Sequence, residues 1–196
     1  MDNLPPAIES RLIELPIGLR DHIERARKVG QELAIRHSVD ASLVDLGIAA
    51  HDLARALNAD ALLSEALEHG IEPGVVERHE PILLHGPVAA RWLEHDDRYD
   101  NDTVIQAVRW HTTGFAGMDE VAKTVFLADK LDPNKVTRYP YLTKVQSLAS
   151  YDIDSAIVEY IDRQIEYLLS RGFLIHPASL AFRNQLIGHQ INQIRP

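Results

Sequence analysis

The sequence predicts an all-α protein, folded as a helical bundle in a single domain. Its prolines leave three long spans without a helix breaker, at residues 17–72, 88–132 and 141–176. Within these spans the apolar residues recur every three or four positions, which is the period of one helix face. No segment shows the apolar–polar alternation of a half-buried strand, and "PILLHG" is too short to distinguish a strand from the start of a helix.

The first proline-free span predicts two helices. Asp40 precedes the second apolar stripe and is a preferred residue type at a helix N-cap. The prolines and glycines around residues 70–86 then predict a long loop. The two stripes consist of Ile23, Ala26, Val29 and Leu33, and of Leu43, Leu46, Ala50, Ala54 and Leu57.

Further helices follow the predicted loop. His85 opens one of them, with Pro87 in its first turn, and Asn101 and Asp102 provide caps for the next. Gly172 is placed to end the last helix, because glycine adopts the left-handed backbone that commonly terminates helices. The remaining stripes consist of Val104, Ala107 and Val108, of Val121, Ala122 and Val125, and of Ile157, Tyr160, Ile161, Ile165 and Leu168.

The composition restricts the classes of function. The chain has 196 residues, no cysteine and a net charge of −9. Disulfides and thiolate metal sites are therefore excluded, and the charge argues against a protein that binds nucleic acid polymers through a basic face. The N-terminal segment has neither a signal peptide pattern nor a long apolar run, so we expect a cytoplasmic protein with no membrane partner. Anionic small molecules remain possible ligands.

Six polar side chains interrupt the apolar stripes and point toward the expected core. An ionised carboxylate in such a place is costly unless it is paired or binds a metal. Imidazole and carboxylate together suit iron, manganese, cobalt or zinc. The six residues are His22, His51, Asp52, His85, His111 and Asp129.

A structural role is the alternative for each of these residues taken alone. A single His on an apolar face is more often a hydrogen-bonded core residue than a ligand, and Asp129 could end its helix in solvent. The His51–Asp52 dipeptide is weak evidence by itself, because His95–Asp96 repeats it in a charge-rich segment. The other histidines stand in polar or terminal contexts and are predicted to lie at the surface: His37, His69, His79, His95, His176 and His189.

Their joint occurrence favours a metal centre. Adjacent residues on a helix point about 100° apart, so His51 and Asp52 do not easily chelate one ion together. They can serve two ions if the Asp52 carboxylate bridges them. Six ligands from five segments therefore fit a two-metal centre better than a single ion.

The order of these residues resembles the HD-domain metal-dependent phosphohydrolases, an all-α superfamily. The closer similarity is to the YqeK-like branch, the symmetrical diadenosine tetraphosphate hydrolases. The first His stands 29 positions before His51, as in that branch, and the similarity runs over residues 17–140. The matching motifs are "DHIERARKVGQELA", "AAHDLAR", "LLHGPVAA", "AVRWHTTG" and "KTVFLADKLDPNK".

The resemblance implies a division of the chain and a ligand set. It implies an N-terminal extension at 1–16, an HD core at 17–140 and C-terminal helices at 141–196 that pack on the core. It also implies two metal ions, iron in the first place, with Asp52 bridging them. The implied ligands are His22, His51, Asp52, His85, His111 and Asp129.

The implied reaction is hydrolysis of diadenosine tetraphosphate to two ADP. A bridging water, its pKa lowered from 15.7 toward roughly 7, would be the nucleophile. Arg55 is the candidate phosphate clamp, where the branch usually has Lys, and Lys135 replaces an Arg. Arg20 could face phosphate or solvent, and Thr112 and Thr113 could instead form a turn closed by Gly114. The expected substrate contacts are Arg20, Arg55, Thr112, Thr113, Lys130 and Lys135, with Asp52 and Arg55 catalytic.

Two other functions remain open from the sequence. An HD phosphohydrolase for a mono-, tri- or cyclic nucleotide would share every ligand. A metal-stabilised regulatory module without turnover is the alternative from a different class, although the retained cations at 55 and 135 argue against it. A homodimer is possible in either case.

Overall fold

The computed structural model describes residues 4–194, and its helices confirm the all-α prediction. Within that range the chain forms twelve α-helices, one short 3-10 helix and one π-helical turn, with no strand among them. None of the described helices combines the length and the apolar character needed to cross a membrane.

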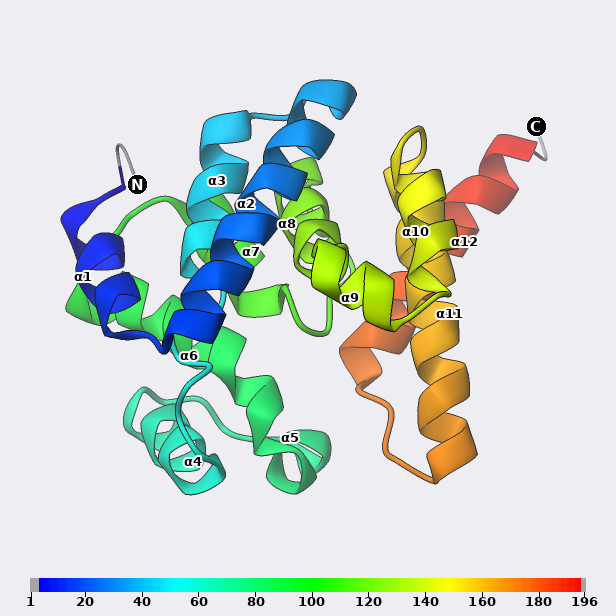
Figure 1. The fold of residues 1–196 in the computed structure, drawn as a ribbon. Coiled ribbons are helices and arrows are strands. Elements are labelled where there is room, and N and C mark those ends of the chain that lie inside the picture. The colour runs from blue at the N-terminus through cyan, green and yellow to red at the C-terminus, as the bar shows by residue number, and fades with distance from the viewer. Residues whose placement is uncertain (1–3, 195–196) are drawn as a thin grey trace.

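The helices follow one another through short connections, as Figure 1 shows. The first half contains α1 (Pro6–Glu14), α2 (Ile17–His37), α3 (Ala41–Ala50), α4 (Ala59–Glu68), α5 (Val75–His79), η1 (Pro81–Leu84) and α6 (His85–Arg91). The second half contains η2 (Trp92–Asp96), α7 (Asp102–Trp110), α8 (Glu120–Lys130), α9 (Pro133–Arg138), α10 (Leu142–Ala149), α11 (Ile153–Arg171) and α12 (Pro177–Ile194).

Side-chain caps explain where several helices begin. The Asp40 carboxylate accepts hydrogen bonds from the backbone of Ser42 and Leu43, as the sequence predicts, and Asn101 caps α7 in the same way. Gly172 has a φ of +67° and ends α11, which confirms the predicted stop. Local sequence therefore sets these boundaries before any tertiary packing is considered.

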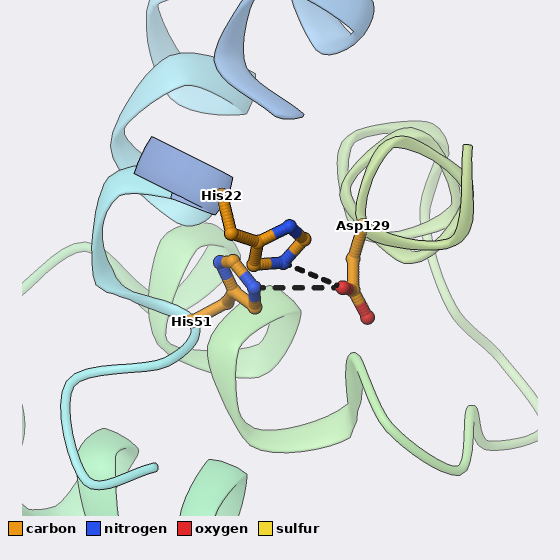
Figure 2. Close-up of side chains that lie close together, drawn as sticks. All are labelled: His22, His51 and Asp129. Atoms are coloured by element: carbon orange, nitrogen blue, oxygen red, sulfur yellow. Dashed lines mark hydrogen bonds and ion pairs between the residues drawn. The ribbon is translucent and has the colours of Figure 1, made fainter. Parts of the chain in front are cut away.

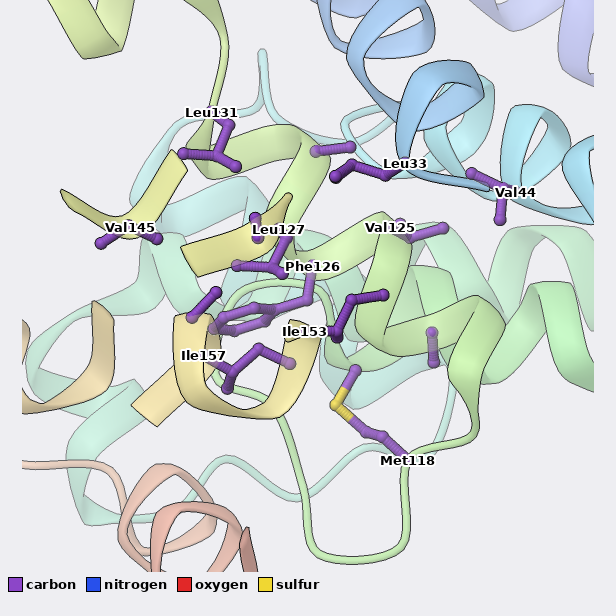
Figure 3. Close-up of a cluster of buried hydrophobic side chains, with 14 of the residues drawn as sticks. Leu33, Val44, Met118, Val125, Phe126, Leu127, Leu131, Val145, Ile153 and Ile157 are labelled. Carbon is purple, nitrogen blue, oxygen red and sulfur yellow. The ribbon is translucent and has the colours of Figure 1, made fainter. Parts of the chain in front are cut away.

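Helix α8 lies at the centre of the molecule and packs against α2, α3, α7 and α11. Every residue of the range 121–130 is buried, including the polar ones. Phe126 of α8 packs beside Ile153 and Ile157 of α11 in the larger apolar cluster (Figure 3). A second cluster joins α1 to α3, α4, α6 and α7. Polar side chains on α8 thus enter the interior, where they require partners.

Two sequence-based expectations about the backbone are wrong. His51 and Asp52 do not lie in the middle of a helix, because α3 ends at Ala50. The chain continues in tight turns, in which the Arg55 amide bonds the Asp52 carbonyl at 2.9 Å. The predicted long loop at 70–86 instead contains α5 and η1, which are too short to show a helical period.

Candidate metal centre

Five segments deliver the six predicted polar residues to one place in the interior. His22 lies in the second turn of α2, and His51 and Asp52 follow α3 directly. His85 begins α6, His111 follows α7, and Asp129 lies near the end of α8. All six are buried, with at most 8% of any of them exposed.

The side chains form two groups at this place: His22, His51 and Asp129 form one, and His85 and His111 form the other. Asp129 Oδ1 lies 3.1 Å from His22 Nε2 and 3.7 Å from His51 Nε2 (Figure 2). Asp52 lies between the groups, because its Oδ2 is 3.4 Å from His51 Nε2 and its Oδ1 is 3.1 Å from His85 Nε2. In each of the sets His22–His51–Asp129 and His51–Asp52–His111, one ligand atom per residue lies within 4.8 Å of the others.

The tautomers of three histidines leave Nε2 free to bind a cation. Nδ1 of His51 lies 2.6 Å from the carbonyl of Ile48, and Nδ1 of His111 lies 2.8 Å from that of Val108. His85 contacts the carbonyl of Ile82 in the same way. A ring whose Nδ1 donates its proton presents an Nε2 lone pair on the other side.

The Nε2 atoms of these rings face one another and the carboxylates of the site. Nε2 of His51 is buried and has no hydrogen-bond partner among the described residues. Nε2 of His85 lies 2.9 Å from Nε2 of His111, an arrangement that is repulsive when both rings donate through Nδ1. A cation between these atoms removes both problems, and neutral imidazole with carboxylate suits a transition metal. The residues present therefore fit a metal site.

The charges in the site also call for a cation. Burial lowers the pKa of His51, but the carboxylates of Asp52 and Asp129 outweigh that effect and raise it to about 10. Burial raises the pKa of Asp52, yet His51 holds it well below its usual range. Burial together with the charge of His85 lowers the pKa of His111. Without a metal, His51 carries the compensating proton.

A second acid supports His22, and the sequence reasoning did not identify it. His22 Nδ1 lies 2.6 Å from Asp132 Oδ2, where the other three histidines use a backbone carbonyl. Arg25 donates to both oxygens of Asp132, at 2.8 and 3.0 Å. Burial raises the pKa of Asp132, but hydrogen bonds from Arg25 and His22 lower it to about 2. The carboxylate therefore stays ionised and orients the His22 ring.

The predicted cations occupy different places. Lys130 Nζ donates to Asp129 Oδ2 and to the His111 carbonyl, at 2.6 and 2.8 Å, and is buried. Lys135 Nζ lies 2.6 Å from Asp129 Oδ1 and is half-buried. Lys135 Nζ also donates to the Asp129 carbonyl at 3.0 Å, so both lysines are engaged by the protein, and Lys135 is the less buried of the two.

Arg55 and Arg20 lie at different hollows of the protein surface. Arg55 is exposed and lines the same cleft as Asp52 and His85. Arg20 lines a separate, smaller hollow with Leu12 and Ile17 at the start of α2. Of the two alternatives for Arg20, the structure supports a place outside the cleft.

The two threonines follow His111 in a turn that Gly114 closes at a φ of +67°. Thr112 Oγ1 lies 3.1 Å from His111 Nε2, so its hydroxyl faces the histidines. Thr113 donates to the Gly114 carbonyl at 3.1 Å and is buried. Thr112 is therefore available to a ligand, and Thr113 belongs to the turn.

A cleft of about 870 Å³ opens beside the histidines. One wall contains Asp52, His111 and Asp129, and the other comes from α11 and residues 172–176. The prediction that all remaining histidines lie at the surface is wrong for His37, His69 and His176, which are half-buried. His176 also lines the cleft and contacts Glu77 Oε1 at 2.8 Å. Its polar neighbours in sequence gave no sign of this packing.

The segment that carries these His and Asp residues matches a known protein family. A model of the HD domain matches residues 19–134. The chain belongs to the HD-domain family. This match contains the whole ligand cluster and ends before α10.

The similarity to named relatives covers more of the chain than the HD domain match does. The chain is 30% identical to the symmetrical bis(5'-nucleosyl)-tetraphosphatase of Halalkalibacterium halodurans, over 81% of this chain and 83% of the relative. It is 25% identical to the protein of that name from Bacillus subtilis, over 80% and 82% of the two chains. A crystal structure of a predicted HD superfamily hydrolase from Clostridium acetobutylicum superposes with a TM-score of 0.86 at 21% identity, covering 93% and 96%. The likeness in fold thus covers most of the chain and extends beyond the HD match, which ends at residue 134.

Proposed function

We propose that this HD-domain protein is a metal-dependent hydrolase that cuts diadenosine tetraphosphate symmetrically into two ADP. The proposal is supported by relatives of that name over four fifths of the chain. The observation that carries it is the unpaired, fully buried Nε2 of His51 between two carboxylates, beside a cleft large enough for a nucleotide.

The ligand set favours two metal ions. In this proposal Asp52 would help to hold both, because its two oxygens face different histidines. His22, His51 and Asp129 would hold one ion, and His85 and His111 would hold the other. Iron is the proposed metal, since imidazole and carboxylate without thiolate suit it, and manganese, cobalt and zinc are the alternatives that elemental analysis separates.

Bound metals supply Lewis acidity and a nucleophile at neutral pH. The chain's own residues orient the substrate. Arg55 is exposed on the cleft wall and binds non-bridging phosphate oxygens, while Lys135 adds a second positive charge. Thr112 faces the same space and donates its hydroxyl to a phosphate oxygen. Asp132 and Arg25 keep the His22 ring in one orientation throughout.

Product analysis tests the proposed function. Attack at the second phosphorus from either end divides the substrate evenly, so ADP is expected as the only nucleotide. ATP with AMP indicates asymmetric cleavage and contradicts the proposal. Turnover of a monophosphate without turnover of diadenosine tetraphosphate supports a different HD phosphohydrolase, and metal binding without any turnover supports a regulatory module. The cytoplasmic location remains a prediction, and the oligomeric state remains open.

A further inference from the structure

The cleft continues beyond the metal centre along α11. Tyr160 marks the near end, because Lys130 Nζ lies 5.9 Å from its ring and also bonds Asp129. Gln164 and Leu168 follow on the same helix, one and two turns farther on, and both line the cleft. A helix rises 1.5 Å per residue, so Leu168 lies about 12 Å along the axis from Tyr160.

The far part of the cleft has apolar and aromatic walls. Tyr167 and Phe173 line it and are 53% and 54% exposed, so both rings are accessible to a ligand. Apolar walls with a few polar groups are typical of pockets for small organic ligands. The other apolar residues of this part come from η1, α11 and the following loop: Ile82, Leu83, Ile165, Leu168, Leu174 and Ile175.

Two contacts fix the loop that forms this wall. His176 Nε2 lies 2.8 Å from Glu77 Oε1, which joins the loop to α5 across 99 residues of sequence. Ser179 Oγ donates to the Thr113 carbonyl at 2.7 Å, which joins the start of α12 to the turn beside the histidines. The far part is therefore a pocket held on both sides by hydrogen bonds.

The chemistry of this pocket suits a nucleoside. Phosphates bound beside Arg55 and Lys135 place the ribose and base farther along the cleft. A base stacks on exposed aromatic rings such as Phe173. Gln164 carries an amide that can donate and accept together, the pattern that pairs with the N6 and N7 edge of adenine.

We propose that the far part of the cleft is an adenosine subsite, in which Phe173 and Leu168 contact the base and Gln164 reads its edge. The inference rests on the proposed function for the position of the phosphates. It assigns base recognition to residues outside the stretch that matches the HD domain, which ends at residue 134.

Calorimetry with the product ADP tests the subsite without turnover. Wild-type protein, as purified with its metals, should bind ADP more tightly than pyrophosphate. Phe173→Ala should weaken ADP binding about tenfold, as loss of one stacked ring does, and leave pyrophosphate binding unchanged. Tyr151→Ala is the matched control, because Tyr151 is 69% exposed and lies outside the cleft lining.

A second pair of variants separates a local effect on binding from a general loss of folding. Leu168→Ala should weaken ADP binding, whereas Leu169→Ala should not, since its neighbour Leu169 is 64% exposed and does not line the cleft. Gln164→Ala should weaken ADP binding and leave pyrophosphate binding unchanged. Wild-type ADP affinity in the Phe173 and Leu168 variants overturns the subsite. An equal loss of ADP and pyrophosphate binding overturns it as well.

The subsite and the proposed reaction can fail separately. If diadenosine tetraphosphate is not hydrolysed but ADP binding depends on Phe173 and Leu168, the subsite holds and the substrate is another adenine nucleotide. If the substrate is cut to ADP but ADP binds no more tightly than pyrophosphate, the reaction holds and the subsite is wrong.

Discussion

His51 is the side chain whose surroundings most strongly demand a cation. Its Nδ1 is occupied by the Ile48 carbonyl, and its Nε2 faces two carboxylates in a fully buried place. The pKa of about 10 means that a proton fills this place at neutral pH when no metal does. A lone core histidine, the alternative that the sequence left open, would not be surrounded in this way.

Asp52 should be the most sensitive ligand to mutation. Purified wild-type protein is expected to hold close to two metal ions per chain, and Asp52→Ala should lose nearly all of them, because this carboxylate faces both groups of histidines. Elemental analysis measures the loss. His95→Ala serves as the control, since His95 is exposed and precedes Asp96 as His51 precedes Asp52. One ion in the wild type, or metal loss in the control, contradicts the assignment.

Asp132 should set the metal affinity through His22. Asp132→Asn keeps a capping oxygen for the Asn134 amide but removes the charge that holds the His22 proton and Arg25. Loss of such a partner typically lowers metal affinity by about 10- to 100-fold. Competition with a chelator of known affinity measures it. Asp40→Asn, a change at the exposed cap of α3 whose carboxylate accepts from the Ser42 and Leu43 amides, should leave the affinity unchanged.

Arg55 should affect turnover and not metal content. If it binds a phosphate oxygen, Arg55→Ala should lower kcat/KM by about 10²-fold, as loss of a charged stabiliser does. Arg55→Lys should recover much of the activity if charge dominates, and little if the two-pronged guanidinium is needed. Steady-state kinetics at equal metal occupancy decides this. Wild-type kinetics in the alanine variant would show that Arg55 only faces solvent.

Helices with a clear apolar period were predictable, and the short ones were not. The sequence indicates the stripe on α11 and its stop at Gly172 directly, because nineteen helical residues repeat the period several times. Helix α5 has five residues, too few for any period. The stripe of α3 continues through Ala54 and Leu57 although the helix ends at Ala50, because the turns that follow also bury these residues wholly or partly.

Gly86 tests how tightly α6 and α7 must pack. A Cβ at this position would lie 2.9 Å from the Val108 carbonyl oxygen and 3.1 Å from His111 Cε1. That carbonyl orients His111, so Gly86→Ala should destabilise the fold by about 1–3 kcal/mol and weaken metal binding. Urea unfolding and chelator competition measure the two effects. Gly18→Ala on α2 meets nothing within 4 Å and should be neutral or slightly stabilising.

The ligand cluster could be predicted from sequence, whereas the opposite wall of the cleft could not. Six polar residues on apolar stripes can be recognised in the sequence, because burying polar groups without partners costs free energy. Leu168 and Phe173 are ordinary apolar residues, and only the folded path of α11 and its loop brings them to the cleft. Asp132 lies within the motif "KTVFLADKLDPNK", but its role depends on contacts with His22 and Arg25, 110 and 107 residues away.

The stability of the metal-free protein should have a maximum near pH 6.5. The pKa of His51 is raised on folding, so its contribution is complete below its unfolded value of 6.5 and is lost as the pH rises toward 10. The pKa of His111 is lowered, so its contribution is present above 6.5 and is lost as the pH falls. Asp132 adds a further loss between its unfolded value of 3.8 and its folded value of about 2.

Bound metal should abolish the alkaline side of this profile. The ion takes the place of the His51 proton between Asp52 and Asp129, so raising the pH no longer removes a positive charge from the site. Urea unfolding of metal-free and metal-loaded protein, carried out in parallel from pH 5 to about pH 10, measures the difference in stability between the two forms. The metal-free protein should lose stability above pH 6.5, and the metal-loaded protein should not. Parallel profiles would show that His51 does not exchange its proton for a metal, because the two states would then carry the same charge at that residue.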